Sequence, residues 1–262
     1  MREHRDADEV DFVIVGTGAG GGTLACKLAE HGFSVVAMDA GPYFRPLEDF
    51  ASDESGQTRL YWTDDRISDG ENPVQLGSNN SGKAVGGSTV HFAMVLLRFR
   101  PEWFRSRSRL GCGFDWPLDW REMWYYCTEA EQALKISGPV TYLGSAPAAP
   151  SLPRARDERR RADLGAGDVM GLSWTETPLA TVSAPRGPAP PCVYRGFCTL
   201  GCSTNVKQSA LVTWIPRAVA AGAEIRDLAM LGRSRSGRTG RPRACTPTGK
   251  ADSGSRKRAR SW

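Results

Sequence analysis

The stretch Asp11-Phe-Val-Ile-Val-Gly-Thr-Gly-Ala-Gly-Gly-Gly22 decides the fold of this chain of 262 residues. The segment Val10–Val15 is apolar and mostly β-branched or aromatic, which is typical of a buried strand. After the glycine-rich turn, Thr23–His31 places its apolar residues on one side of a predicted helix. A second apolar segment, Phe33–Asp39, ends in a carboxylate. Strand, tight turn, helix and strand within about 30 residues predict a βαβ unit with a parallel sheet.

The glycines form the pattern Gly16-x-Gly18-x-x-Gly21, which directly follows the first strand and opens the helix. In a dinucleotide-binding fold the first glycine permits the tight turn, the second lets the main chain approach a pyrophosphate, and the third lets the helix pack on the strand. The helix N-terminus adds N–H donors and a positive dipole end. Asp39 could accept a hydrogen bond from a ribose hydroxyl and would repel the 2′-phosphate of NADP. We therefore predict that this turn binds a dinucleotide and is not a purely structural turn. The motif alone does not distinguish FAD from NAD.

The composition is that of an ordinary globular protein, with 40% hydrophobic and 24% charged residues. No apolar run approaches the roughly 18 residues that cross a bilayer. Met1–Val10 is charged and lacks the apolar core of a secretory signal, so we expect a cytoplasmic protein without a membrane span. Seven cysteines without an export signal make disulfides an unfavoured interpretation and metal or redox ligands the first to consider.

Two segments differ in composition from the rest of the chain. Gly144–Gly167 is dominated by Ala, Pro and Arg, and Arg233–Trp262 by Arg, Gly, Ser, Pro and Thr. Neither offers enough apolar surface to offset the entropy of the chain, so we expect both to be disordered or poorly packed. The last segment has ten Lys or Arg and one acidic residue, which accounts for the net charge of +5 of the whole chain. Because it offers almost no aromatic residue to stack on bases, we expect no nucleic-acid partner.

With Met38-Asp-Ala-Gly-Pro42, the opening stretch resembles the glucose–methanol–choline (GMC) family of FAD-dependent oxidoreductases. The segment Gly82-Lys-Ala-Val-Gly-Gly-Ser-Thr-Val-His-Phe-Ala93 resembles the second glycine-rich segment of that family, which lies along the flavin. Cys192–Ile225 is similar to the later part of the family's N-terminal region. The resemblance covers about Val10–Gly138 and Leu172–Leu231, and implies an α/β fold: a Rossmann-like FAD-binding domain with a parallel sheet, plus an incomplete substrate-facing region.

The resemblance also implies an activity. GMC enzymes oxidise a CH–OH group of an alcohol or sugar: a hydride passes to the flavin while a base takes the hydroxyl proton, and some pass electrons on to an acceptor protein. The family's catalytic histidine lies in its C-terminal part, whereas this chain leaves the family pattern at about Gly232. We therefore assign no catalytic residue and expect a truncated copy whose end is altered or out of frame. The alternative is a non-catalytic flavin-binding remnant.

The same resemblance assigns residues to FAD. Gly86, Gly87 and Ser88 would lie against the ribityl chain and ring, and the main chain around Met230 would meet the adenine. His91 falls where some relatives carry a histidine bonded covalently to the flavin, and a buried histidine without that bond is the alternative. Asp39 stands where the family usually has Glu. The full set of expected cofactor-binding residues is Gly16, Gly18, Gly20, Gly21, Asp39, Ala40, Gly86, Gly87, Ser88, His91 and Met230.

Cys192, Cys198 and Cys202 place three thiols within eleven residues, interleaved with glycine. Thiolates at short spacing in a bent loop can hold an iron–sulfur cluster. The spacing resembles that of GMC-type sugar dehydrogenases with a three-iron cluster, although Ser203 stands where those relatives often have Pro. The alternative is three small buried cysteines in a turn.

These patterns divide the chain into four parts. Residues 1–64 form the FAD-binding βαβ unit, and residues 65–171 contact the flavin and begin a substrate-facing region, which includes a predicted helix from Asp119 to Leu134. Residues 172–232 return to the FAD-binding domain and end in the strand-like Ala223–Leu231. Residues 233–262 are the basic tail.

Overall fold

A computed structural model describes residues 3–5, 8–50, 58–63, 65–77, 80–138, 169–171, 177–185, 190–236 and 242–247. The predicted disorder of Gly144–Gly167 lies outside these residues.

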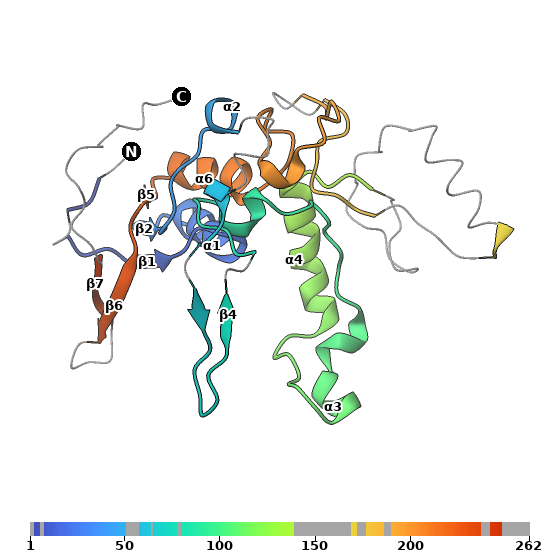
Figure 1. Ribbon diagram of the computed structural model, residues 1–262, viewed down its shortest axis with the longest axis horizontal. Coiled ribbons are helices and arrows are strands. Elements are labelled where there is room, and N and C mark those ends of the chain that lie inside the picture. Colours follow the sequence, from blue (N-terminus) through green and yellow to red (C-terminus); the bar gives the residue numbers. More distant parts are fainter. Residues whose placement is uncertain are drawn as a thin grey trace.

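The predicted βαβ unit is confirmed. Strand β1 (Phe12–Val15) pairs in parallel with β2 (Val35–Met38), and helix α1 (Ala19–Glu30) connects them. A third parallel strand, β5 (Glu224–Arg226), joins the other edge of β2, so the sheet order is β1-β2-β5 (Figure 1). A parallel sheet with helices packed on it is the predicted α/β fold.

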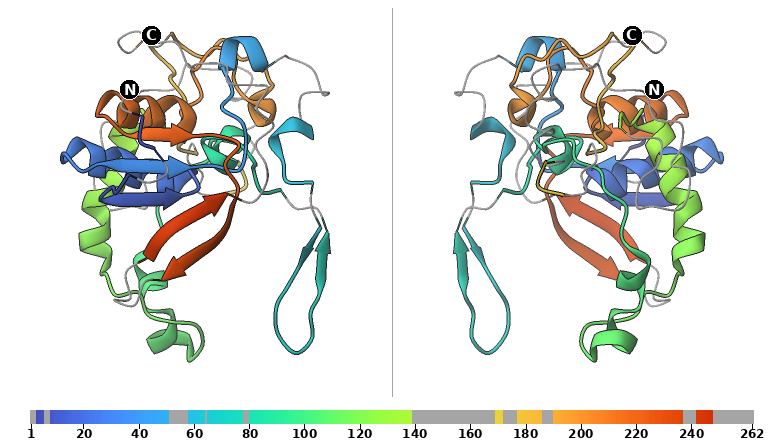
Figure 2. Two further views of the ribbon diagram at one scale, coloured as in Figure 1. Left: turned by 90° about the vertical axis from the view of Figure 1, so that its left-hand side faces the viewer. Right: turned by 90° about the vertical axis from the view of Figure 1, so that its right-hand side faces the viewer.

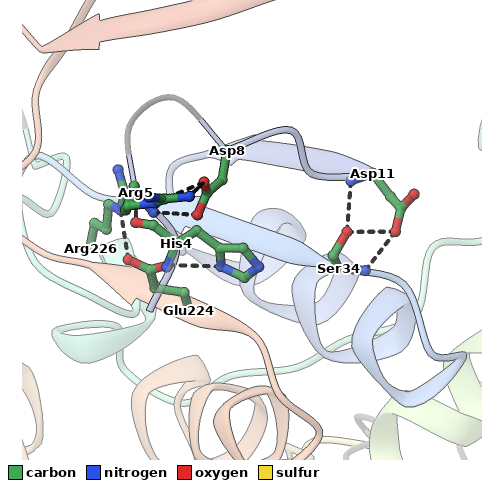
Figure 3. A network of polar contacts seen from close by, with 7 residues as sticks. All are labelled: His4, Arg5, Asp8, Asp11, Ser34, Glu224 and Arg226. Carbon is green, nitrogen blue, oxygen red and sulfur yellow. Dashed lines mark hydrogen bonds and ion pairs between the residues drawn. The ribbon is translucent and has the colours of Figure 1, made fainter. Parts of the chain in front are cut away.

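Side chains near the N-terminus help to fix this sheet (Figure 3). Asp11 accepts hydrogen bonds from the main-chain N–H and the hydroxyl of Ser34, at 2.8 and 2.6 Å, just before β1 and β2 begin. His4 Nδ1 lies 3.0 Å from Glu224 Oε2, and Arg226 Nε donates to the other oxygen of the same carboxylate at 2.8 Å. The segment before β1 is thereby attached to β5, more than 200 residues later.

The core lies between α1, the sheet and helix α6 (Ala210–Ala220). The two side views show how these elements are arranged (Figure 2). Helix α1 contributes small side chains to this contact, Ala25, Cys26 and Ala29, which let α6 and its buried Trp214 approach closely. A second buried cluster lies beside it, consisting of Phe44, Phe50, Leu60, Ala84, Val85, Val90, Leu211 and Ile215.

The prediction that the first strand is buried is wrong for most of β1. Ile14 is buried, but Phe12, Val13 and Val15 are 39%, 46% and 58% exposed. In a doubly wound sheet the first strand is flanked on both sides. Among the strands that the structure describes, β1 has only β2 as a neighbour, so its apolar side chains remain uncovered there.

The middle of the chain forms shorter elements around one long helix. Helix α4 (Trp120–Ala133) confirms the helix predicted from Asp119 to Leu134, and Asp119 caps it by accepting from Glu122 N at 2.8 Å. The remaining elements are α2 (Pro46–Asp49), an antiparallel hairpin of β3 (Arg66–Ile67) and β4 (Gln75–Gly77), and α3 (Ser106–Leu110).

Part of the basic tail, for which the sequence predicts disorder or poor packing, forms regular structure among the described residues. Strands β6 (Leu231–Ser236) and β7 (Pro242–Pro247) pair as an antiparallel hairpin. Main-chain hydrogen bonds supply this pairing, and they do not depend on an apolar composition. The strand expected over Ala223–Leu231 is also interrupted, because β5 ends at Arg226 and Leu228 adopts a φ of 52°. None of the helices in the described part of the chain has the length and apolar character needed to span a bilayer.

Candidate dinucleotide-binding site

The turn between β1 and α1 has the geometry that its glycines predict. Gly16 adopts a φ of 83°, a conformation that favours glycine. A Cβ on Gly21 would lie 2.0 Å from the carbonyl oxygen of Gly16, so only glycine fits where the helix meets the turn. Gly18 caps α1 without a side-chain hydrogen bond, and the first turn of α1 contains no acidic residue. The N-terminus of this helix is therefore suited to an anion.

The second glycine-rich segment packs directly on the first. Gly18 and Gly87 meet main chain to main chain, because a Cβ on Gly87 would lie 2.7 Å from the Cα of Gly18. Gly86 and Gly87 both adopt positive φ, of 96° and 55°, and Gly87 begins the 3₁₀ turn η2 (Gly87–Val90). The two motifs, about 70 residues apart in the sequence, thus form one glycine-lined surface.

A buried hydroxyl joins this surface to the end of β2. Thr17 is fully buried, and its Oγ1 donates to Asp39 Oδ2 at 2.6 Å and accepts from the main-chain N–H of Gly86 at 3.1 Å. The carboxylate of Asp39 also accepts from the N–H groups of Thr17 and Gly41, both at 2.9 Å. Three segments of the predicted site therefore meet at Thr17 and Asp39. Thr17 could not be predicted from the sequence, since it occupies a variable position of the glycine pattern.

This arrangement bears on the role expected for Asp39. The residue lies at the end of β2 as predicted, but its side chain is only 7% exposed and turns toward its own glycine loop. The contact between Asp39 and a ribose stays a prediction. Its hydrogen bonds with Thr17 hold the glycine loop in place.

His91 follows η2 and is buried. Its ring centroid lies 4.5 Å from that of Tyr61, and its Nε2 has no hydrogen-bond partner among the described residues. Burial, and then the nearby charge of Lys207, lower the pKa of His91 below its ordinary value, so the imidazole is neutral at pH 7. A neutral ring with an unpaired nitrogen is what attachment to a cofactor would require.

Lys207 is a second buried residue that links this turn to the cysteine loop. Its Nζ donates to the carbonyl oxygens of Val90 and Cys198, at 2.8 and 2.5 Å, and the side chain is almost completely buried. Burial lowers the pKa of Lys207 to about 8. Sequence reasoning did not single out this residue, because a lone lysine in a polar stretch gives no sign of burial.

The other expected cofactor residues are positioned less distinctively. A Cβ on Gly20 would meet nothing within 4 Å, so this glycine is not required by packing. Ser88 Oγ accepts from the N–H of Gly82 at 2.9 Å, which closes the second glycine turn. Ala40 and Met230 are half-buried, and Ala229 N donates to Asp39 O at 2.8 Å, which brings the segment after β5 to the end of β2.

Several known proteins are similar in sequence to this chain. No protein-family model matches the chain. The chain is 26% identical over 238 residues to the 2-methyl-1,2-propanediol dehydrogenase of Mycolicibacterium austroafricanum, which covers 84% of this chain and 42% of the relative. It is 30% identical over 248 residues to a GMC-type oxidoreductase of Mycobacterium tuberculosis, which covers 91% of this chain and 35% of the relative.

The chain matches the N-terminal part of GMC-type oxidoreductases. It spans less than half the length of the curated GMC relatives that it matches. Among solved structures, a formate oxidase of Aspergillus oryzae superposes with a TM-score of 0.54 at 15% identity, over 89% of this chain and 41% of that one. At this identity the likeness shows the fold, and it agrees with the Rossmann-like sheet.

The iron–sulfur cluster expected from the resemblance to GMC sugar dehydrogenases is not supported. Cys192, Cys198 and Cys202 do line one small cavity, of about 30 Å³. Across the part of the chain that the structure describes, however, no three His, Cys, Asp or Glu side chains are grouped so that they could hold a metal ion. Two of the thiols have local partners instead: Tyr194 N donates to Cys192 Sγ at 3.4 Å, and Cys202 Sγ lies 3.4 Å from Thr204 Oγ1. These contacts, and the hydrogen bond of Lys207 Nζ to Cys198 O, hold the loop.

Proposed function

We propose that this chain binds FAD and forms the cofactor-binding part of a GMC-type enzyme that oxidises a CH–OH group of an alcohol or sugar. The observation that carries the proposal is the main-chain contact of Gly18 with Gly87 beside the N-terminus of α1, which has no side-chain cap and no acidic residue in its first turn. No Cβ could be accommodated where Gly87 meets Gly18, so the two turns form a smooth cradle of the kind that takes a pyrophosphate. The name of the propanediol dehydrogenase relative supports an alcohol as substrate.

The chain's own residues would hold the cofactor in three places. The N–H groups at the start of α1 would meet the pyrophosphate. Gly86, Gly87 and Ser88 would lie along the ribityl chain, and the segment around Met230 would lie at the adenine end. When bound, FAD accepts the hydride that leaves the substrate carbon. We assign no base for the hydroxyl proton within the described residues, because His4 pairs with Glu224 and His31 Nδ1 lies 2.7 Å from Lys27 O.

We also propose that His91 lies against the flavin ring and is its point of covalent attachment. The support is its buried, unpartnered Nε2 directly after the second glycine turn. To test this, the protein is expressed with FAD and precipitated with acid. Yellow colour in the pellet of the wild type, and in the supernatant for His91→Asn, is the expected result. Colour in the supernatant for both proteins would mean that the flavin is not covalently bound.

The central test of the proposed function has two stages. The full chain is first titrated with FAD, and quenching of flavin fluorescence with a stoichiometry of one is expected. The loaded protein is then mixed anaerobically with a panel of alcohols and sugars, and loss of the flavin absorbance near 450 nm is followed. Failure to bind FAD would refute the proposal. Binding without bleaching by any member of the panel would support a flavin-binding protein that is not an oxidoreductase on its own.

A further inference from the structure

The turn that carries His91 is held by hydrogen bonds from a segment more than 100 residues later in the chain. The Nζ of Lys207 donates to Val90 O at 2.8 Å. Three residues further along, Ala210 N donates to the hydroxyl of Thr89 at 2.9 Å. The two residues that directly precede His91 are therefore each bound to this segment, which fixes the main chain at the point where the imidazole leaves it.

The ammonium group of Lys207 contacts both chain neighbours of His91. Besides its bond to Val90 O, its Nζ lies 5.1 Å from the centroid of the Phe92 ring, a cation–π contact. The residue is only 2% exposed. Burial disfavours the charged form, yet a pKa of about 8 keeps the amine mostly protonated at pH 7. An apolar side chain would fill the same space without this cost, so the positive charge points to a use of its own.

The surroundings of His91 show what that charge does. Burial of the ring, and then the charge of Lys207, lower the pKa of His91, and no other charged group among the described residues contributes. Tyr61 packs against the same ring, with 4.5 Å between the centroids. A carboxylate in place of the ammonium would have the opposite effect and would hold a proton on the imidazole. A cation at this position therefore favours the neutral ring, in which one nitrogen keeps its lone pair.

We propose that Lys207 is a positioning residue for His91: it fixes the turn that carries the imidazole, and its positive charge disfavours an imidazolium there. The use of this arrangement rests on the proposed function, in which His91 lies against the flavin and must offer an unprotonated nitrogen. The effect on His91 itself does not require FAD, because Lys207 acts through contacts within the chain.

The test follows His91 by NMR in the full chain labelled with ¹³C-histidine, which has three histidines. The signal that is missing in His91→Asn identifies His91. Without FAD, the titration midpoint of this signal in the wild type should lie below 6.5. In Lys207→Met, whose side chain is uncharged and similar in length, the midpoint should shift upward. Amide hydrogen exchange over Gly87–Phe92 should also become faster in this variant, because the turn loses one of its supports.

Thr89→Val is the matched control, because it removes the other hydrogen bond to the same turn and leaves the charge of Lys207 in place. It should also speed up amide exchange, but the His91 midpoint should stay at its wild-type value.

A midpoint of 6.5 or above in the wild type would overturn the proposal even if neither variant folds. An unchanged midpoint or unchanged amide exchange in Lys207→Met would overturn it as well. The same holds for an equal upward shift in Thr89→Val, which would show that the midpoint responds to loosening of the turn and not to charge. A wild type that shows the expected midpoint but does not bind FAD in a titration would count against the proposed function alone.

Discussion

The hydroxyl of Thr17 donates a 2.6 Å hydrogen bond to the carboxylate of Asp39, and both side chains are buried where β1, β2 and the second glycine turn meet. The same hydroxyl accepts from Gly86 N at 3.1 Å. A single oxygen atom, Thr17 Oγ1, therefore joins the two glycine motifs to each other and to the acid that ends β2. Asp39, the residue expected to bind the ribose, therefore also supports the loop that would hold the pyrophosphate.

Removal of this hydroxyl should loosen both motifs together. Thr17→Val keeps the shape but leaves Gly86 N without its acceptor, so we expect a loss of about 1–3 kcal/mol in the free energy of unfolding and weaker FAD binding. Urea unfolding and FAD titration measure the two effects. Thr17→Ser retains the hydroxyl and serves as the control. Equal stability of the Val and Ser variants would contradict the role of the hydroxyl.

The glycines of α1 should differ sharply in their tolerance of a methyl group. Gly21→Ala places Cβ 2.0 Å from Gly16 O and should prevent FAD binding or folding. Gly20→Ala, one residue earlier in the same helix, meets nothing within 4 Å. Because alanine is the better helix former, this control should gain up to about 1 kcal/mol of stability. Thermal unfolding and flavin content distinguish the two, and a tolerated Gly21→Ala would refute the close packing of helix and turn.

The pair between β5 and the N-terminal segment should make stability depend on pH in the acid range. Burial raises the pKa of Glu224, but hydrogen bonds from Arg226 and His4 outweigh it and hold the pKa below the ordinary 4.5. A carboxyl whose pKa is lowered on folding stabilises the protein above its unfolded pKa, and this is lost as the pH falls through the folded value. Wild type should therefore be more stable than Glu224→Gln at pH 7, and the difference should shrink below the unfolded pKa of 4.5. A difference that does not change with pH would argue against this ion pair.

Lys207 should give a dependence of the same sign in the alkaline range. Burial lowers its pKa from 10.5 to about 8, so the unfolded chain binds more protons than the folded one between these values. Stability supplied by this group must then rise with pH across that window. Comparison of urea unfolding for wild type and Lys207→Met from pH 7.5 to 10 isolates the effect from other groups. Parallel pH profiles for the two proteins would show that Lys207 keeps its ordinary pKa when folded.

Much of the fold could be predicted from local patterns. The alternation of an apolar run, glycines and a helix predicts β1, α1 and β2, and the positive φ of Gly16 and the tight approach at Gly21 agree with the roles given to them. These features are local, because each depends on residues a few positions apart. The cap at Asp119 is predictable for the same reason.

The features that could not be predicted from the sequence depend on contacts between residues far apart in the chain. Arg98 and Glu131 are 33 residues apart, and His4 and Glu224 are 220 apart. No periodicity reports such pairs. The inward turn of Asp39 depends on a hydroxyl supplied by another segment. The iron–sulfur interpretation is not supported: short spacing brings three thiols to one small cavity, but among the described residues no three metal-ligating side chains are grouped so that they could hold a metal ion.

The position of β1 has a practical consequence for work with this chain. Along the described sheet, the outer side of β1 has no paired strand, and three of its four side chains are substantially exposed and apolar. An open strand with apolar faces is a template for aggregation, because another chain can add to its main-chain hydrogen bonds. Light scattering of the purified protein should therefore increase steeply with concentration. Replacement of Val13 or Val15 by lysine should increase the solubility of the protein, since a charged side chain on an edge strand disfavours pairing with another copy of the chain.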